Sequence, residues 1–102
     1  MKKSRKEIAL EFANKINSKY IKQIILFGSV ARGDDKQDSD IDLLIVVTSR
    51  KKTISLIEET VADFMYKYQE LISAHIISET RYNKSKNYSF FNNINIEGVI
   101  LV

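Results

Sequence analysis

Residues 24–47 read IILFGSVARGDDKQDSDIDLLIVV, and this stretch decides the fold. The runs 24–27 and 40–47 have the composition of strands buried on both faces, and the second run carries two carboxylates at its start. The polar segment 28–39 between them holds two of the chain's three glycines and has room for only one or two helical turns. The stretch therefore predicts two core strands joined by a short polar connection.

Helices are predicted on both sides of this stretch. Over 3–19, apolar residues recur at helical spacing while Lys and Glu fill the other faces. Over 54–68 the apolar residues follow the same spacing, with Ser55 or Thr53 as the N-cap and 48–52 as a basic loop before it. The residues that carry the two patterns are Ile8, Phe12, Ala13, Ile16 and Tyr20, then Ile57, Val61, Phe64, Met65 and Tyr68.

The C-terminal part predicts a third strand and further short elements. Residues 71–78 (LISAHIIS) have strand composition, and one or two short helices follow from residue 79. After Gly98 the apolar run 99–102 either adds a strand or docks on the core. The packing residues expected in the helical part are Tyr82, Tyr88, Phe90, Phe91 and Ile94. The order of elements predicts an α/β (α+β) fold, with residues 1–102 as a single domain.

Composition excludes several classes of protein. With 102 residues and 44% hydrophobic residues, the chain is long enough for one core. The absence of Cys excludes disulfides, thiolate zinc sites and a Cys nucleophile. Glu7 and Glu11 interrupt what would be the apolar part of a signal peptide, and no run approaches the roughly 20 apolar residues that cross a bilayer. A cytoplasmic protein without a membrane segment is therefore predicted.

Charge is distributed unevenly along the chain. The net charge is +3, but residues 1–22 hold seven bases against two acids. The basic residues there alternate with apolar and acidic ones, as on a solvated helix face, which argues against a nucleic-acid partner. Five carboxylates crowd into nine residues farther on: Asp34, Asp35, Asp38, Asp40 and Asp42. The acidic segment is the more informative of the two.

The Gly-Ser turn and the paired carboxylates point to phosphate and metal chemistry. Gly28-Ser29 at the end of a buried strand lets a ligand approach the backbone, and a helix starting at Ser29 aims free N–H groups and the serine hydroxyl at an anion. Asp40 and Asp42, two positions apart on a strand, leave the same face with Cα atoms about 6.6 Å apart. Carboxylates placed in this way suit a hard cation such as Mg²⁺.

Each part taken alone also fits a purely structural role. Gly28-Ser29 also fits an ordinary turn after a strand, and the two carboxylates also fit a solvated strand end that caps neighbouring N–H groups. Arg32, Gly33 and Ser39 join these parts within one short segment. The structural explanations would have to coincide several times, so the sequence favours a phosphate and metal site.

The segment GSVARGDDKQDSDIDLLIV resembles the nucleotidyltransferase superfamily of the DNA polymerase β type, and in particular its minimal stand-alone members. The resemblance implies a small mixed sheet with packed helices, like the polymerase β palm. It implies transfer of a nucleoside monophosphate, with AMP expected, from a nucleoside triphosphate to an acceptor, using Mg²⁺. It places Gly28 and Ser29 on the β and γ phosphates and Asp40 and Asp42 on the metal as the catalytic pair. Arg32 either reaches phosphate or pairs with the acidic loop, and Ser39 orients or caps the strand.

The sequence departs from the superfamily pattern on the third strand. Active members carry a third carboxylate there, whereas residues 71–78 contain Ser73, Ala74 and His75 and no acid. Glu70 and Glu79 flank the strand and would need another register. His75 fits either a general base or a packed, hydrogen-bonded residue.

Two classes of function follow from the resemblance. Minimal nucleotidyltransferases are often encoded beside a helical HEPN-type protein as antitoxin and toxin, so an enzyme that modifies such a partner is one hypothesis. A nucleotide-binding regulatory module without turnover is the other. The missing acid favours the module, whereas the complete segments GSVARG and DIDLLIV favour the enzyme. The chain is short for an antibiotic-modifying enzyme, which carries an added acceptor domain. The Phe90–Phe91 pair predicts core packing or a subunit interface of a homo-oligomer rather than base stacking.

Overall fold

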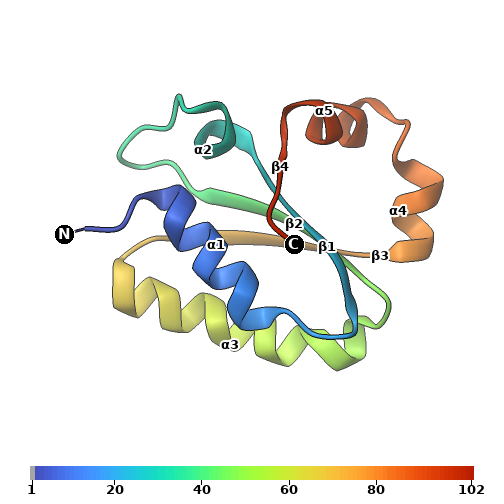
Figure 1. Cartoon of the computed structure of the whole chain (residues 1–102), viewed down its shortest axis with the longest axis horizontal. Coiled ribbons are helices and arrows are strands. Elements are labelled where there is room, and N and C mark those ends of the chain that lie inside the picture. The colour runs from blue at the N-terminus through green and yellow to red at the C-terminus, as the bar shows by residue number, and fades with distance from the viewer. Residues whose placement is uncertain (1) are drawn as a thin grey trace.

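A computed structural model describes residues 2–102 and shows a four-stranded mixed sheet with five helices (Figure 1). The expected α+β fold with a small mixed sheet is confirmed. In chain order the elements of the described residues are α1 (Arg5–Ile16), β1 (Ile21–Phe27), α2 (Gly28–Arg32), β2 (Ile41–Val47), α3 (Arg50–Tyr68), β3 (Ile72–Ser78), α4 (Glu79–Ser85), α5 (Ser89–Glu97) and β4 (Val99–Ile100).

The sheet has the strand order β3-β2-β1-β4. β1 pairs antiparallel with β2 and β4, whereas β2 and β3 run parallel because α3 crosses over between them. The terminal apolar run thus adds a short antiparallel strand at one edge. At the other edge lies β3. This order brings the start of β2 between the end of β1 and the start of β3.

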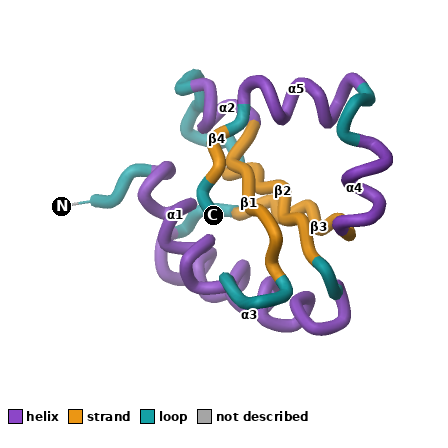
Figure 2. Tube along the Cα trace, turned by 45° about the vertical axis from the view of Figure 1, so that its right-hand side comes forward, coloured by secondary structure: helices purple, strands orange, loops and turns teal. Residues whose placement is uncertain are grey.

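Helices cover both faces of the sheet, with α1 and α3 on one side and α4 and α5 on the other (Figures 1 and 2). Each side has its own apolar cluster, since side chains along a strand alternate between faces. Phe12, Leu43 and Phe64 belong to the larger cluster, and Ile25, Leu44 and Ile94 to the smaller one. No helix of residues 2–102 is long and apolar enough to span a bilayer.

Serine side chains cap the starts of α1, α3 and α4. At α1, Ser4 accepts a hydrogen bond from the Glu7 N–H while the Glu7 carboxylate accepts one from the Ser4 N–H, which is a capping box. At α3, Ser49 is the cap and accepts from the Lys52 N–H. The expected cap at Thr53 or Ser55 is wrong, and so is the basic loop 48–52. Thr53 instead lies inside the helix, where its hydroxyl donates to the Ser49 carbonyl.

Two further expectations need correction. β1 begins at Ile21 rather than residue 24. The polar residue Gln23 interrupts the apolar run, but it still pairs with Val46 after a register shift. Tyr88 and Phe90 are 69% and 56% exposed, so neither belongs to the buried core, although Phe90 contacts the Phe27 and Phe91 rings. Tyr88 lies before α5 in the turn between two helices, and Phe90 lines an open pocket. The packing roles expected for Tyr82, Phe91 and Ile94 are confirmed.

Glu11 joins α1 to α3 through two partners on α3, Lys67 and Tyr68. It accepts hydrogen bonds from the Tyr68 hydroxyl at 2.6 Å and the Lys67 ammonium at 3.4 Å, and it also pairs with Lys3. These contacts lower the pKa of Glu11 from 4.5 to about 2. The hydrogen bond from Lys3 contributes most, followed by the one from Tyr68. The ionised carboxylate is therefore the form that the folded state favours.

We expect Glu11→Gln to destabilise the fold at neutral pH by roughly 1 kcal/mol, a modest value because the carboxylate is partly exposed and screened. A lowered pKa contributes stability above the unfolded value and loses it as the pH falls through the folded one. The difference in unfolding free energy between wild type and Glu11→Gln should thus shrink from pH 5 to pH 2. Urea unfolding at several pH values measures it, and a constant difference would contradict the assignment. Glu59→Gln, an exposed carboxylate on α3, is the control.

Candidate functional site

The site begins where β1 turns into α2. Gly28 has φ +79°, and a Cβ built on it would lie 2.4 Å from Oδ2 of Asp42. Only glycine therefore fits between the backbone and the carboxylate. α2 starts at Gly28, one residue earlier than expected, and its N-cap residue Phe27 makes no side-chain hydrogen bond to the helix. The first N–H groups of α2, including that of Ser29, consequently have no side-chain cap from Phe27.

Asp42 is the second residue of the inner strand β2, at the end of the sheet nearest α2. It is half-buried, and its register partners are Phe27 on β1 and Ser73 on β3. Burial raises the pKa of Asp42, and nearby Asp40 adds to the rise, while His75 and Arg32 oppose it. A carboxylate whose pKa is shifted by burial and by nearby charges is a candidate functional group.

Asp40 and Ser39 precede β2, whose first residue is Ile41, so the expectation that Asp40 lies on the strand is wrong. Asp40 is exposed, and its charge is near enough to affect Asp42. The Ser39 hydroxyl accepts a hydrogen bond from the Lys36 N–H at 2.8 Å, so Ser39 closes the turn before the carboxylate pair.

Arg32 projects from the end of α2 and is paired within the chain. Its guanidinium contacts Asp34 at 3.2 Å and Glu97 at 3.6 Å, and its side chain is 45% exposed. Pairing with the acidic loop, one of the two expected roles, is thus observed. Because Arg32 also lies near enough to lower the pKa of Asp42, it remains within reach of an anion at this site.

Arg5 of α1 is a residue that the sequence did not single out. Its guanidinium donates to Glu70 at 3.1 Å, to Asp35 at 2.9 Å, and to the carbonyls of Lys36 and Gln37. One side chain thereby fixes the loop that leads into Asp40. The helix pattern of residues 3–19 assigned this base to a solvated face, and no local signal shows that the acidic loop folds back over it.

A pocket of about 290 Å³ opens beside Gly28, between α2 and α5. Phe27, Arg32, Phe90 and Asn93 are among the residues that line it. Phe90 meets Phe27 edge to face, with ring centroids 6.1 Å apart. The sequence pattern predicts core packing or a subunit interface for Phe90 and no role for Asn93. Only the folding of α5 back over β1 brings both next to the glycine turn.

The third strand places Ser73 and His75 on the face that carries Asp42. Ser73 is directly opposite Asp42, and His75 is two positions farther along. His75 is exposed, lies 3.3 Å from the Ser73 hydroxyl and contacts the Phe27 ring at 5.5 Å between centroids. No acid of β3 faces the site, and Glu70 is instead held by Arg5. His75 is hydrogen-bonded but is not a core residue.

A metal at this site would have Asp40 and Asp42 as its carboxylate ligands. Among residues 2–102 no cluster of three or more His, Cys, Asp or Glu side chains forms a complete metal cage. The two carboxylates nevertheless fit Mg²⁺, which takes oxygen ligands and is usually bound by one or two carboxylates plus substrate phosphates. A dication would also offset the cost of burying the Asp42 charge, which is the cost that raises the pKa of this carboxyl.

The fold and the glycine turn beside a strand carboxylate are the features expected of a nucleotidyltransferase. Residues 6–97 match the family described as the nucleotidyltransferase domain. The chain belongs to this family of enzymes.

Two relatives come from Methanocaldococcus jannaschii. The protein named "Putative protein adenylyltransferase MJ0604" is 43% identical over 94 residues, covering 89% of this chain and 91% of the relative. "Putative protein adenylyltransferase MJ0141" is 33% identical over 101 residues, covering 97% and 92%. Among solved structures, a toxin–antitoxin complex with AMP-PNP has a chain with the same fold. Its TM-score is 0.63 at 17% identity, with 98% of this chain and 73% of that chain covered.

Proposed function

We propose that this chain transfers AMP from Mg-ATP to a hydroxyl group of a partner protein. The observation that carries the proposal is the Asp42 carboxylate, half-buried against Gly28 with a raised pKa. The names of the two relatives support adenylyl transfer to protein. The fold shared with a toxin–antitoxin complex supports a toxin partner, for which a HEPN-type protein is our candidate.

In the proposed reaction the acceptor oxygen attacks the α-phosphorus of ATP. The bond to the bridging oxygen breaks, pyrophosphate leaves, and the acceptor hydroxyl gives up its proton. Mg²⁺ held by Asp40 and Asp42 would neutralise charge on the phosphates. Gly28 and Ser29 would bind the β and γ phosphates through backbone N–H groups and the serine hydroxyl. Arg32 would turn from Asp34 toward the same phosphates, and Ser39 would hold the turn before Asp40.

The pocket between α2 and α5 offers room for the nucleoside. It borders Gly28, and Phe90 is exposed along it. An adenine ring on Phe90 would place its triphosphate toward the start of α2. His75 lies on the same sheet face as Asp42 and is a candidate acceptor of the proton.

A nucleotide-binding module that performs no transfer is the second candidate function. The observation that favours it is β3, which presents Ser73 and His75 to the site where active members of the superfamily have a carboxylate. Such a module would retain Mg-ATP binding and partner recognition while lacking turnover.

Incubation with α-³²P-ATP, Mg²⁺ and a purified HEPN-type partner separates the two candidates. We expect label on the partner and release of pyrophosphate, both lost when EDTA is added. Isothermal titration with Mg-AMP-PNP reports binding separately. Binding without transfer to any partner would establish the module instead. If Mg-AMP-PNP does not bind at all, both candidates are wrong.

A further inference from the structure

The strand β3 is an open edge of the sheet. It pairs along its whole length with β2, and no other strand of the described residues lies on its far side. Natural edge strands are usually protected by Lys, Pro or a bulge. The sequence ISAHIIS contains neither residue, and its register with β2 has no shift. This edge is therefore suited to pairing with another strand.

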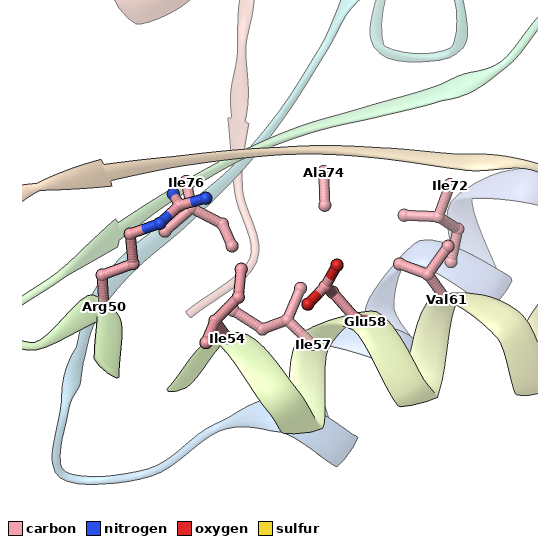
Figure 3. A pocket seen from close by; sticks show the side chains of 8 residues that line it. All are labelled: Arg50, Ile54, Ile57, Glu58, Val61, Ile72, Ala74 and Ile76. Carbon is pink, nitrogen blue, oxygen red and sulfur yellow. The ribbon is translucent and has the colours of Figure 1, made fainter. Parts of the chain in front are cut away.

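A pocket of about 360 Å³ with both aliphatic and charged lining residues lies next to this edge, between β3 and α3 (Figure 3). Ala74 and Ile76 line it from the strand, and Ile54 and Val61 line it from the helix. These four side chains are half-buried rather than fully covered. The pocket is on the sheet face opposite Asp42, since Ala74 alternates with Ser73 and His75 along β3. The surface is consequently separate from the nucleotidyltransferase site.

Two opposite charges flank the pocket on α3. Arg50 lies at one end beside Ile76, and the Glu58 carboxylate points toward Ala74 (Figure 3). They are eight positions apart, about 12 Å along the helix. Both are exposed, and neither takes part in the ion pairs within residues 2–102.

We propose that this surface binds a second copy of the chain through antiparallel pairing of the two β3 strands. A two-fold axis through the middle of β3 would set the two α3 helices antiparallel across it. Arg50 of each copy would then face Glu58 of the other, because a two-fold interface uses the same patch on both sides. In that arrangement the two charges of one copy are complementary to the two charges of the other. The two pockets would close against each other, and the sheet would extend to eight strands.

Charge reversal tests the proposed pairing in sedimentation equilibrium of the full chain at about 0.1 M salt. Wild type should have twice the 11.8 kDa mass of the chain. Arg50→Glu and Glu58→Arg each turn two attractive contacts into two repulsive ones and should weaken the dimer about tenfold or more. The double variant Arg50→Glu/Glu58→Arg restores opposite charges across the axis, so its dimer constant should return to within about threefold of wild type.

A matched control uses Lys51 and Glu59 on the same helix. They have the same spacing and charges as Arg50 and Glu58, but neither lines the pocket. Lys51→Glu and Glu59→Arg should leave the dimer unchanged. Circular dichroism confirms that each variant is folded. A monomeric wild type up to about 1 mM, single variants that dimerise normally, or a double variant that stays monomeric would each overturn the proposal.

Discussion

Asp42→Asn protein is expected to lose AMP transfer by about a hundredfold to a thousandfold, the scale seen when a group that stabilises transition-state charge is removed. The amide keeps the shape of the carboxylate but removes the charge that would hold Mg²⁺ between protein and phosphates. Labelled-ATP transfer measures the loss. Asp38→Asn is the control, because this carboxylate belongs to the same acidic segment and is exposed.

The same substitution should make the protein more stable when neither metal nor nucleotide is bound. Burial raises the pKa of Asp42, so the folded state favours the neutral form. A raised carboxylate pKa destabilises the fold once the pH exceeds the unfolded value, and the cost persists at pH 7. We expect the Tm of Asp42→Asn to exceed that of wild type by about 1–3 °C, a small rise because the carboxylate is only half-buried.

Mg-AMP-PNP should reverse this order of stability. Wild type binds the ligand and gains stability by mass action, whereas Asp42→Asn should show little change in Tm. An Asp42→Asn protein that is less stable than wild type without metal would contradict the destabilising burial of the Asp42 charge. A variant that keeps transfer would remove Asp42 from the catalytic pair.

Gly28→Ala is expected to damage both stability and nucleotide binding. The backbone at Gly28 has φ +79°, which costs an L-residue about 1–2 kcal/mol, and the new methyl group would also collide with Oδ2 of Asp42. Either the carboxylate or the start of α2 must move. We expect the free energy of unfolding to fall by about 2–4 kcal/mol and Mg-AMP-PNP binding to weaken at least about tenfold.

Gly33→Ala separates the two causes. Gly33 has φ +81°, but a Cβ there meets nothing within 4 Å. This variant should show the backbone cost alone, about 1–2 kcal/mol, and should bind Mg-AMP-PNP normally. In an Asp42→Ala background the Gly28→Ala penalty should shrink toward that of Gly33→Ala, because the colliding oxygen is gone. Equal effects of the two glycine variants in wild type would show that the collision is unimportant. Urea unfolding and calorimetry provide both quantities.

Local pattern was sufficient to predict the centre of the fold. The apolar runs around Gly28 and Asp42 read as buried strands, and the structure confirms both, with the glycine in contact with the carboxylate. Helix boundaries were harder, because Ser49, Thr53 and Ser55 are all acceptable caps by residue type. The choice depends on where β2 ends and how α3 packs, which a local pattern does not contain.

The remaining parts of the site depend on contacts between distant segments. Arg5 meets Asp35 and Glu70 from 30 and 65 positions away. Phe90 reaches Phe27 only because α5 folds back along β1. Neither residue lies in the motif that identified the site. The local pattern predicts a solvated helix face for Arg5 and the core or a subunit interface for Phe90. The absence of an acid on β3, in contrast, was visible in the sequence and is retained in the structure.

Because of the contacts of Arg5, the site depends on the first turn of helix α1. Arg5 is the first residue of α1, and its guanidinium is the fixed point for the loop that leads into Asp40. Helix ends open more readily than any other part of a helix. When the first turn of α1 frays, the loop loses its anchor at the same moment, so the two segments form one cooperative unit. Local order at the N-terminal turn is therefore a condition for a fixed carboxylate pair, although the two are separated by a third of the sequence.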